Sequence, residues 1–349
     1  MTIVYFIVIL GVIVFVHELG HLLVAKAFNV YCREFAIGFG PILKRIQGKE
    51  TVYSIRAVPL GGFVSMAGET DVTLEEGIDP SRTLKAIHPF KRILIMLAGV
   101  FANFVLAFVI FVGIFGLAGQ VNVPPEPVVA DVIENSAAAE AGVLANDRIV
   151  KITFSDGRSF EPKDFFEVIN MTQMVSDSMI FTLEREGELV EVSITARFNE
   201  DENRYMLGMY LPPQETKEIS FFETFGYAAK TIVDTVASVV VALSFLLRGM
   251  GLESLSGPVG IYEVTSQQAQ AGFSALVVLT AILSLNIGIF NLLPLPILDG
   301  GRVILTIIEW IIGRPLPEKV EGALISLSTL LILALVIFIT FQDLSKIFG

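Results

Sequence analysis

The residues best suited to chemistry lie near the start of the chain, in the run His17-Glu18-Leu19-Gly20-His21. On a helix, positions i and i+4 share a face, so both imidazoles would point toward one ion. Glu18 would lie beside the open coordination position, where a carboxylate can take a proton from water. Two of the three histidines in 349 residues fall in this motif, so chance or a polar packing patch is a poor explanation. The spacing therefore predicts a hydrolytic zinc site with Glu18 as the catalytic base.

A catalytic zinc ion normally has three protein ligands, so the third must come from elsewhere in the chain. His88 is the only other histidine, and no acidic residue lies near it in the sequence. Asp299 is the stronger candidate, because it follows an apolar run that Pro294 and Pro296 interrupt. Such a segment must face a cavity or protein, since proline breaks the backbone hydrogen bonds that lipid cannot replace. Asp299 could instead cap a following helix, Gly300–Ile312, but the incomplete ligand set favours coordination. We therefore expect one zinc ion, held by His17, His21 and Asp299.

Composition places the chain in a membrane. Its residues are 53% hydrophobic and its mean hydropathy is +0.70, which is unusual for a soluble domain. Four apolar runs are each long enough to cross a hydrocarbon core of about 30 Å: residues 3–28, 91–118, 273–295 and 323–341. The first run is too long for a signal peptide and lacks a basic leading segment, so we expect it to remain as a span.

The net charge of −12 is unevenly distributed. Residues 119–219 contain eight Lys/Arg and nineteen Asp/Glu, whereas residues 26–92 contain ten and seven. Because basic residues favour the cytoplasmic side, we expect the first loop inside and the acidic segment outside. Such an acidic surface argues against nucleic acid as a partner. The single cysteine, Cys32, excludes an intramolecular disulfide.

The segment Arg33–Met66 does not have the pattern of a helix. Short alternating pieces such as Thr51–Ile55 are separated by glycines and prolines, including Gly38, Gly40 and Pro41. We interpret the segment as small strands and turns that lie against the inner membrane face. An ordinary cytosolic hairpin is the alternative.

Residues 128–198 have the pattern of a compact soluble domain that follows a proline-containing linker, Val121–Pro127. The pattern predicts a helix near Ala137–Ala141 and strands at Val128–Ile133, Arg148–Thr153, Ser178–Glu184 and Val190–Thr195. The stretch Ser136–Ile152 resembles the helix, turn and strand of PDZ domains, with Ala137 in place of a common proline and Asn146 in place of the usual glycine. Asparagine tolerates a left-handed backbone, so the fold should survive. A generic small β-domain is the alternative.

Three motifs together resemble the site-2 proteases, a family of intramembrane zinc metalloproteases, and most closely their bacterial RseP-type branch. They are the HELGH run, the PDZ-like insert and the segment Asn291–Gly301, which reads NLLPLPILDGG. Further matching pieces are Gly38–Pro41, Val58–Phe63, Ala67–Glu69, Gly99–Asn103 and Ser256–Gly260. The chain departs from the family pattern at Arg302, where histidine is frequent, and in having one PDZ-like domain where some relatives carry two.

The resemblance also implies roles for individual residues. It assigns zinc to the two motif histidines and Asp299, and the catalytic base to Glu18. It implies a membrane-re-entrant β element at Arg33–Met66. Substrate binding is expected at Asn291, Gly38, Phe39, Gly40 and Pro294.

The depth of the ligands constrains the topology. The motif histidines lie in the later half of a span that runs from outside to inside, so the zinc ion lies toward the cytoplasmic leaflet. Residues 273–295 must run the same way to bring Asp299 to that depth, and this requires Phe221–Leu247 not to cross. That segment is apolar but carries three charged residues in its first half, as interfacial amphipathic helices do.

We therefore predict a helical membrane protein with four transmembrane helices, both termini outside, a membrane-associated β element and one inserted PDZ-like α+β domain. The expected domains are residues 1–118 with the β region at 33–66, an extracytoplasmic PDZ-like domain at 119–200, a linker with interfacial helices at 201–272, and the last two spans at 273–349. The expected location is the bacterial cytoplasmic membrane. Expected partners are the lipid bilayer and single-pass membrane proteins, such as an anti-sigma factor or a remnant signal peptide, cut within the membrane.

Two other classes of function remain as alternatives. An inactive membrane scaffold would hold no metal and would be indifferent to loss of Glu18. A transporter would use the intramembrane charges as a relay, but the sequence has no internal repeat of the kind that many transporters contain.

Overall fold

The computed structural model describes residues 1–69, 78–172, 175, 177–199, 204–246 and 257–348. The chain divides into two compact units. The first unit comprises Met1–Ile114, Phe225–Val239 and Ser256–Gly349, and the second comprises Phe115–Thr224 and Val240–Leu255. Three sequence-based boundaries, at residues 200/201, Leu247 and Ser256, lie outside the described residues.

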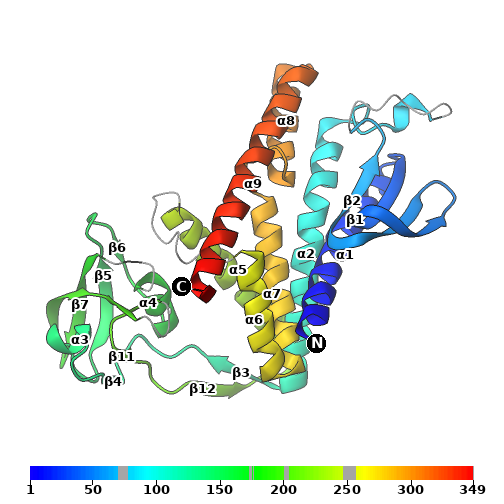
Figure 1. The fold of residues 1–349 in the computed structure, drawn as a ribbon. Helices are drawn as coiled ribbons and strands as arrows, with labels where there is room; N and C mark the ends of the chain where they lie inside the picture. Colours follow the sequence, from blue (N-terminus) through cyan, green and yellow to red (C-terminus); the bar gives the residue numbers. More distant parts are fainter. Residues whose placement is uncertain (70–77, 173–174, 176, 200–203, 247–256, 349) are drawn as a thin grey trace. The chain divides into compact units, whose positions relative to one another are not determined.

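Long apolar helices form most of the first unit (Figure 1). Among the described residues, five helices are long and apolar enough to cross a membrane. They are α1 (Thr2–Ala27), α2 (Pro89–Ala118), α5 (Phe221–Leu246), α7 (Phe273–Asn291) and α9 (Glu318–Phe348). Four of them coincide with the apolar runs of the sequence, and the fifth is α5, which the sequence predicts to be interfacial.

Helices α1 and α7 run in one direction through the bundle, and α2 and α9 run in the other (Figure 1). The start of α1 packs against the start of α7 through Ile9 and Leu276, and the ends of both helices lie near the same end of the bundle (Figure 1). The chain therefore leaves α2 and enters α7 at the same end of the bundle.

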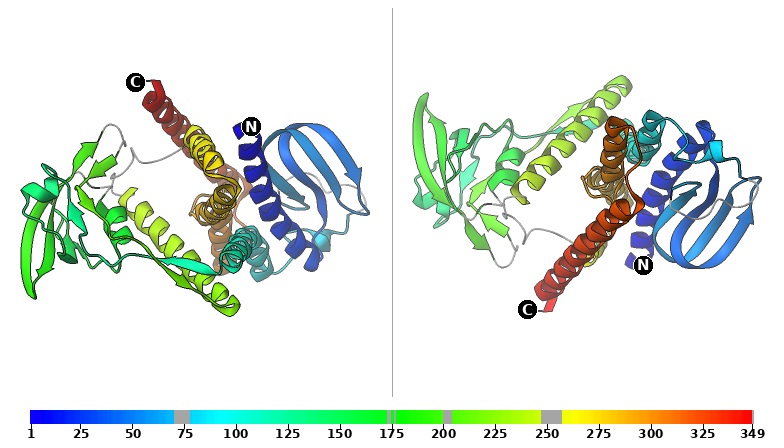
Figure 2. Two further views of the ribbon diagram at one scale, coloured as in Figure 1. Left: turned by 90° about the horizontal axis from the view of Figure 1, so that it is seen from below. Right: turned by 90° about the horizontal axis from the view of Figure 1, so that it is seen from above.

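The predicted β region forms two long strands, β1 (Cys32–Gln47) and β2 (Val52–Met66). Both strands bend, because the backbone at Gly38, Gly40 and Gly61 adopts positive φ values of 87°, 81° and 102°. As a result residues 34–37 pair with residues 52–55 on one side and 62–65 on the other, while residues 42–47 pair with 52–56. In the described part of the chain, Gly62–Met66 is thus one edge of this sheet. The sheet packs on α1, which lies between the sheet and α7 in both views of Figure 2.

Three shorter helices complete the first unit. They are the 3-10 turn η1 (Pro80–Arg82), α6 (Pro258–Ala271) and α8 (Asp299–Ile312). The N-terminus of α6 is capped from a distant helix, because Oδ2 of Asp343 on α9 accepts hydrogen bonds from the backbone N–H groups of Gly257 and Gly260. The sequence gives no sign of this contact, since it joins residues more than 80 positions apart.

The second unit has its own buried apolar core, which includes Ile149, Phe181 and Ile194. Its main sheet has the strand order β6-β5-β7-β8. These strands are β5 (Arg148–Thr153), β6 (Ser159–Phe160), β7 (Ser178–Arg185) and β8 (Glu188–Thr195), and the helices are α3 (Ala137–Glu140) and α4 (Phe165–Thr172). The predicted helix and three of the four predicted strands are present. Asn146, which stands where PDZ domains usually have glycine, has a φ of 72°, a left-handed backbone conformation that asparagine tolerates.

Short paired strands are the main departure from the sequence interpretation of the second unit. The predicted linker begins within β3 (Gln120–Val123), which pairs with β12 (Glu215–Glu218), and the predicted strand at residues 128–133 is only β4 (Asp131–Val132), which pairs with β11 (Met209–Tyr210). A further pair is β9 (Arg197–Asn199) with β10 (Arg204–Met206). These pairings were missed because two- to four-residue strands have no resolvable periodicity.

Candidate metal centre

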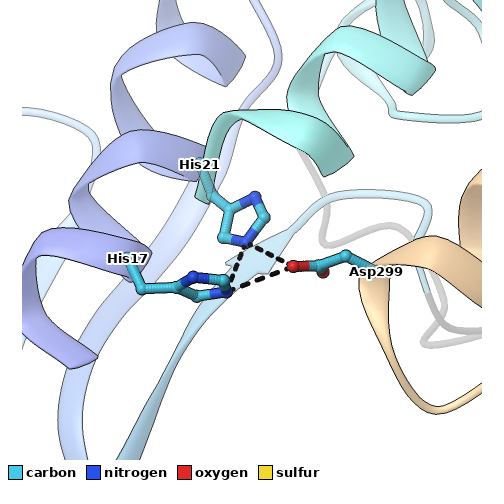
Figure 3. Close-up of side chains that lie close together, drawn as sticks. All are labelled: His17, His21 and Asp299. Atoms are coloured by element: carbon cyan, nitrogen blue, oxygen red, sulfur yellow. Dashed lines mark hydrogen bonds and ion pairs between the residues drawn. The ribbon is translucent and has the colours of Figure 1, made fainter. Parts of the chain in front are cut away.

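The structure brings together the three residues predicted to bind zinc (Figure 3). His17 and His21 project from one face of α1, and Asp299 is the first residue of α8. The Nε2 atoms of the two histidines are 3.2 Å apart. Oδ2 of Asp299 lies 3.1 Å from Nε2 of His17 and 3.4 Å from Nε2 of His21. Both histidines are buried.

This triangle of atoms has the dimensions of one face of a zinc tetrahedron. With bonds of about 2.0–2.1 Å to nitrogen and oxygen, two ligand atoms of tetrahedral zinc lie about 3.3 Å apart. The three observed separations lie within 0.2 Å of that value. A neutral imidazole presents a lone pair at Nε2, so three acceptor atoms converge here. The residues therefore fit one zinc ion, with one position left for water or substrate.

The ring orientation of His21 suits this ligand role. Its Nδ1 lies 2.8 Å from the backbone oxygen of Ile95 on α2. An Nδ1–H that donates to a carbonyl leaves Nε2 unprotonated and available for a metal. The sequence could not assign this partner, because any backbone carbonyl can serve.

Two glycines let α1 and α2 approach closely enough to form the site. A Cβ at Gly99 would overlap Nε2 of His21 and lie 2.8 Å from Nε2 of His17. A Cβ at Gly20 would overlap the backbone oxygen of Ala98. The space at the ligand atoms therefore depends on the missing side chain at Gly99.

Glycines also position Asp299. Side chains at Gly300 and Gly301 would overlap the backbone oxygens of Leu292 and Leu295, so the turn before α8 packs directly on the start of that helix. Helix α8 has no side-chain hydrogen bond at its N-cap, Leu298. The side chain of Asp299 is directed at the histidines, and the alternative role as a helix cap is not observed.

Glu18 lines the same cavity as the three ligands. This cavity has a volume of about 240 Å³ and is also lined by Asn291 and by four residues on the edge of β2: Gly62, Phe63, Val64 and Met66. A Cβ at Gly62 would lie 3.1 Å from Cγ of Glu18, so β2 packs directly on the predicted base.

The other residues predicted to bind substrate are not among those that line the cavity. Gly38 and Gly40 form the bend of β1, and Phe39 stacks on Phe63 with ring centroids 6.3 Å apart. Pro294 lies in the turn between α7 and α8. The β residues at the cavity are those after Gly61, and substrate binding at the glycine-rich bend stays a prediction.

His88, the alternative ligand, lies elsewhere. Its Nδ1 accepts a hydrogen bond from the backbone N–H of Phe90, and its ring contacts Trp310 edge-on at 5.4 Å. Within the described residues, the group that could hold a metal contains only His17, His21 and Asp299.

The cavity shares an ion pair with a second, smaller cavity of about 60 Å³. Glu69 and Arg302 form an ion pair, and both residues line both cavities. A second ion pair joins Arg92 on α2 to Glu309 on α8 at 2.8 Å, where both side chains are largely buried. The histidine that is frequent in the family at position 302 is thus replaced by an arginine with a partner on the loop after β2.

The sequence profile described as peptidase family M50 matches residues 5–335. Similar proteins include the regulator of sigma-W protease RasP of Bacillus subtilis, which is 31% identical with 99% of each chain covered. The zinc metalloprotease RasP of Geobacillus kaustophilus is 32% identical over 99% of this chain and 98% of that protein. The zinc metalloprotease RasP of Bacillus licheniformis is 30% identical over 99% of both.

Proposed function

Since this chain belongs to peptidase family M50, we propose that it cuts single-pass membrane proteins within their transmembrane segments. It is a zinc metalloprotease and a multi-pass membrane protein. The observation that carries the proposal is the triangle of His17, His21 and Asp299 inside the helical bundle, with Glu18 on the same cavity. A site inside the bundle favours substrates that enter from the membrane.

The proposed mechanism assigns one role to each residue. When bound by His17, His21 and Asp299, zinc supplies a Lewis acid for the peptide carbonyl and for water. Glu18 accepts the proton of the attacking water. It then donates that proton to the amine nitrogen of the leaving peptide, so one residue serves as base and acid. The helices and the β edge around the cavity hold these groups in place before the substrate arrives.

The edge of the β sheet is the proposed binding surface for the substrate backbone. A transmembrane helix must unwind before hydrolysis, and its freed N–H and C=O groups then need partners that lipid does not provide. Gly62–Met66 is an edge that lines the cavity, so it can pair with an extended substrate by strand addition. Asn291 lines the same cavity and can add side-chain hydrogen bonds. Substrates with small or helix-breaking residues should unwind most readily.

We also propose four transmembrane spans in a bacterial cytoplasmic membrane, with α5 at the interface. The parallel course of α1 and α7 supports this, because an additional crossing by α5 alone would reverse α7 (Figure 1). The excess of Lys/Arg in residues 26–92 favours a cytoplasmic position for the end of the bundle that carries the metal site. The acidic second unit is then extracytoplasmic.

Two variants at the metal site test the function. Glu18→Gln keeps the ligands and should retain stoichiometric zinc while losing cleavage of a single-pass reporter. Asp299→Ala removes one ligand and should lose both zinc and cleavage. Metal content and reporter cleavage are measured on the same purified samples. Stoichiometric zinc in Asp299→Ala would remove this residue from the ligand set, and cleavage by Glu18→Gln would remove the base.

Cysteine labelling tests the topology. In a variant with Cys32 replaced, single cysteines at Lys49, Glu161, Glu223 and Gln270 are exposed to a membrane-impermeant reagent. We expect labelling of position 49 from the cytoplasm and of the other three from outside. Labelling of positions 223 and 270 from opposite sides would show that α5 crosses.

A further inference from the structure

Asn103 lies near the middle of α2, and its polar side chain has no exposed surface. Its amide nitrogen Nδ2 lies 3.3 Å from Nδ1 of His17, the ring nitrogen on the far side from the proposed zinc. Its backbone oxygen accepts a hydrogen bond of 2.9 Å from the hydroxyl of Ser284 on α7. Asn103 therefore touches the ligand helix α1 through its side chain and α7 through its backbone.

The ligand role of His17 determines what its Nδ1 must do. If Nε2 binds a metal, the neutral ring carries its proton on Nδ1, and this N–H needs an acceptor. An amide N–H₂ at 3.3 Å would place two donors face to face. The amide oxygen and nitrogen are distinguished only by their hydrogen bonds, so the orientation has to be chosen from the network.

The oxygen of the same amide also favours the opposite orientation, in which Oδ1 faces His17. In the present orientation, Oδ1 of Asn103 is buried and has no hydrogen-bond partner among the described residues. A 180° rotation of the amide places this oxygen against the Nδ1–H of His17. The rotation both gives the oxygen a donor and removes the clash between donors. His21 offers the parallel case, since its Nδ1 faces the backbone oxygen of Ile95 at 2.8 Å.

We propose that Asn103 is a positioning residue for the metal site. Its side-chain oxygen accepts from Nδ1–H of His17 and fixes the tautomer and ring orientation in which Nε2 faces Asp299. The inference rests on the proposed ligand role of His17 and adds a residue to it. Loss of such an outer partner typically lowers metal affinity by about 10–100-fold.

Two substitutions of similar size separate this role from packing. Asn103→Leu keeps the volume but removes the acceptor, and Asn103→Asp keeps an acceptor. We expect zinc affinity, measured by competition with a chromophoric chelator on the purified full chain in detergent, to fall by about 10–100-fold in Asn103→Leu. In Asn103→Asp it should stay close to that of the unaltered chain. A packing role predicts the reverse order, because leucine suits an apolar interior and a carboxylate does not.

Ser284→Ala is the matched control, because Ser284 contacts only the backbone oxygen of Asn103 in the network described above. It should lower thermal stability without lowering zinc affinity. The proposal is overturned if Asn103→Leu binds zinc as tightly as the unaltered chain, or if the leucine and aspartate variants weaken binding equally. Absence of zinc from the unaltered chain would instead refute the proposed function, so the two failures are distinguishable.

Discussion

Each unit of this protein contains a carboxylate with little exposed surface, and the two carboxylates, Asp147 (side chain 1% exposed) and Asp299 (17% exposed), have opposite surroundings. In the second unit, Asp147 accepts hydrogen bonds from Nε and Nη2 of Arg185 at 2.8 and 2.7 Å and from the backbone N–H of Leu144 at 2.8 Å. In the first unit, the ion pairs of the described residues join Asp299 only to two histidines, which are neutral when they bind a metal. Apart from these two imidazoles, its Oδ2 has no partner among the described residues.

The difference distinguishes a structural carboxylate from a proposed metal ligand. Asp147 has all the charge and hydrogen bonds that it needs within the protein, so it stabilises a turn and requires no ligand. When both histidines are in the neutral form that binds a metal, Asp299 meets two other acceptors, an arrangement that is unfavourable until a cation enters. Asp147 is the more buried of the two, so burial does not mark the proposed ligand; the identity of the neighbouring atoms does.

Gly99→Ala should have the largest effect on this contrast. The new Cβ would overlap Nε2 of His21. We therefore expect cleavage to be lost and zinc affinity to fall by about 100-fold or more, the upper end of the effect of losing a hydrogen-bond partner of a metal ligand. Gly113→Ala is the control in the same helix, because a Cβ there meets no atom within 4 Å. Alanine favours helix by about 1 kcal/mol over glycine, so neither variant should destabilise α2 itself. Equal zinc content in both variants would contradict the assigned position of the metal.

Asp147→Ala should affect the second unit and leave the metal site unchanged. Removing this carboxylate leaves Arg185 and the Leu144 N–H without their acceptor, which should destabilise the second unit by about 1–3 kcal/mol. Zinc stoichiometry should not change. Hydrogen exchange followed by mass spectrometry reports both units in one experiment: β5 and β7 should lose protection, and α1 should not. Loss of zinc from this variant would show that the two units are coupled.

Acidification should give the smallest and most selective effect. Burial opposes ionisation of Asp147, but the hydrogen bonds from Arg185 and Leu144 outweigh it and hold the pKa of this carboxyl below its ordinary value. A carboxyl whose pKa is lowered in the folded state stabilises the fold at pH values above its pKa in the unfolded chain, which is about 3.9. This stabilisation is lost as the pH falls through the pKa of the folded state. Stability of the second unit should therefore decrease below about pH 4. Asp147→Asn should flatten that part of the profile, and an unchanged profile would contradict the role of the pair.

The candidate metal site could be predicted from the sequence because two of the proposed ligands and the proposed base lie within five residues of one helix. Asp299 was found from the chemical need for a third ligand and from the prolines before it. Asn103 and Gly99 could not be assigned roles in this way, since in sequence they are small residues of an apolar helix. Their roles depend on which face of α2 meets α1, and that is fixed only by packing.

The β region shows the same limit. The glycines at 38, 40 and 61 predicted bends, but not which strand would become the edge beside Glu18. That order follows from pairing across more than 20 residues, which local patterns do not determine. The ion pair between Glu69 and Arg302 was missed for the same reason.

The glycines around the metal site have a consequence for anyone who wishes to transplant it. Copying His17, Glu18, His21 and Asp299 onto another helical bundle would reproduce the side chains but not the space that they occupy. The recipient would also need hydrogen in place of a side chain at the equivalents of Gly99, Gly300 and Gly301, where any Cβ overlaps a ligand atom or a supporting carbonyl. A designed version should therefore begin from the backbone approach of the helices and add the ligands last.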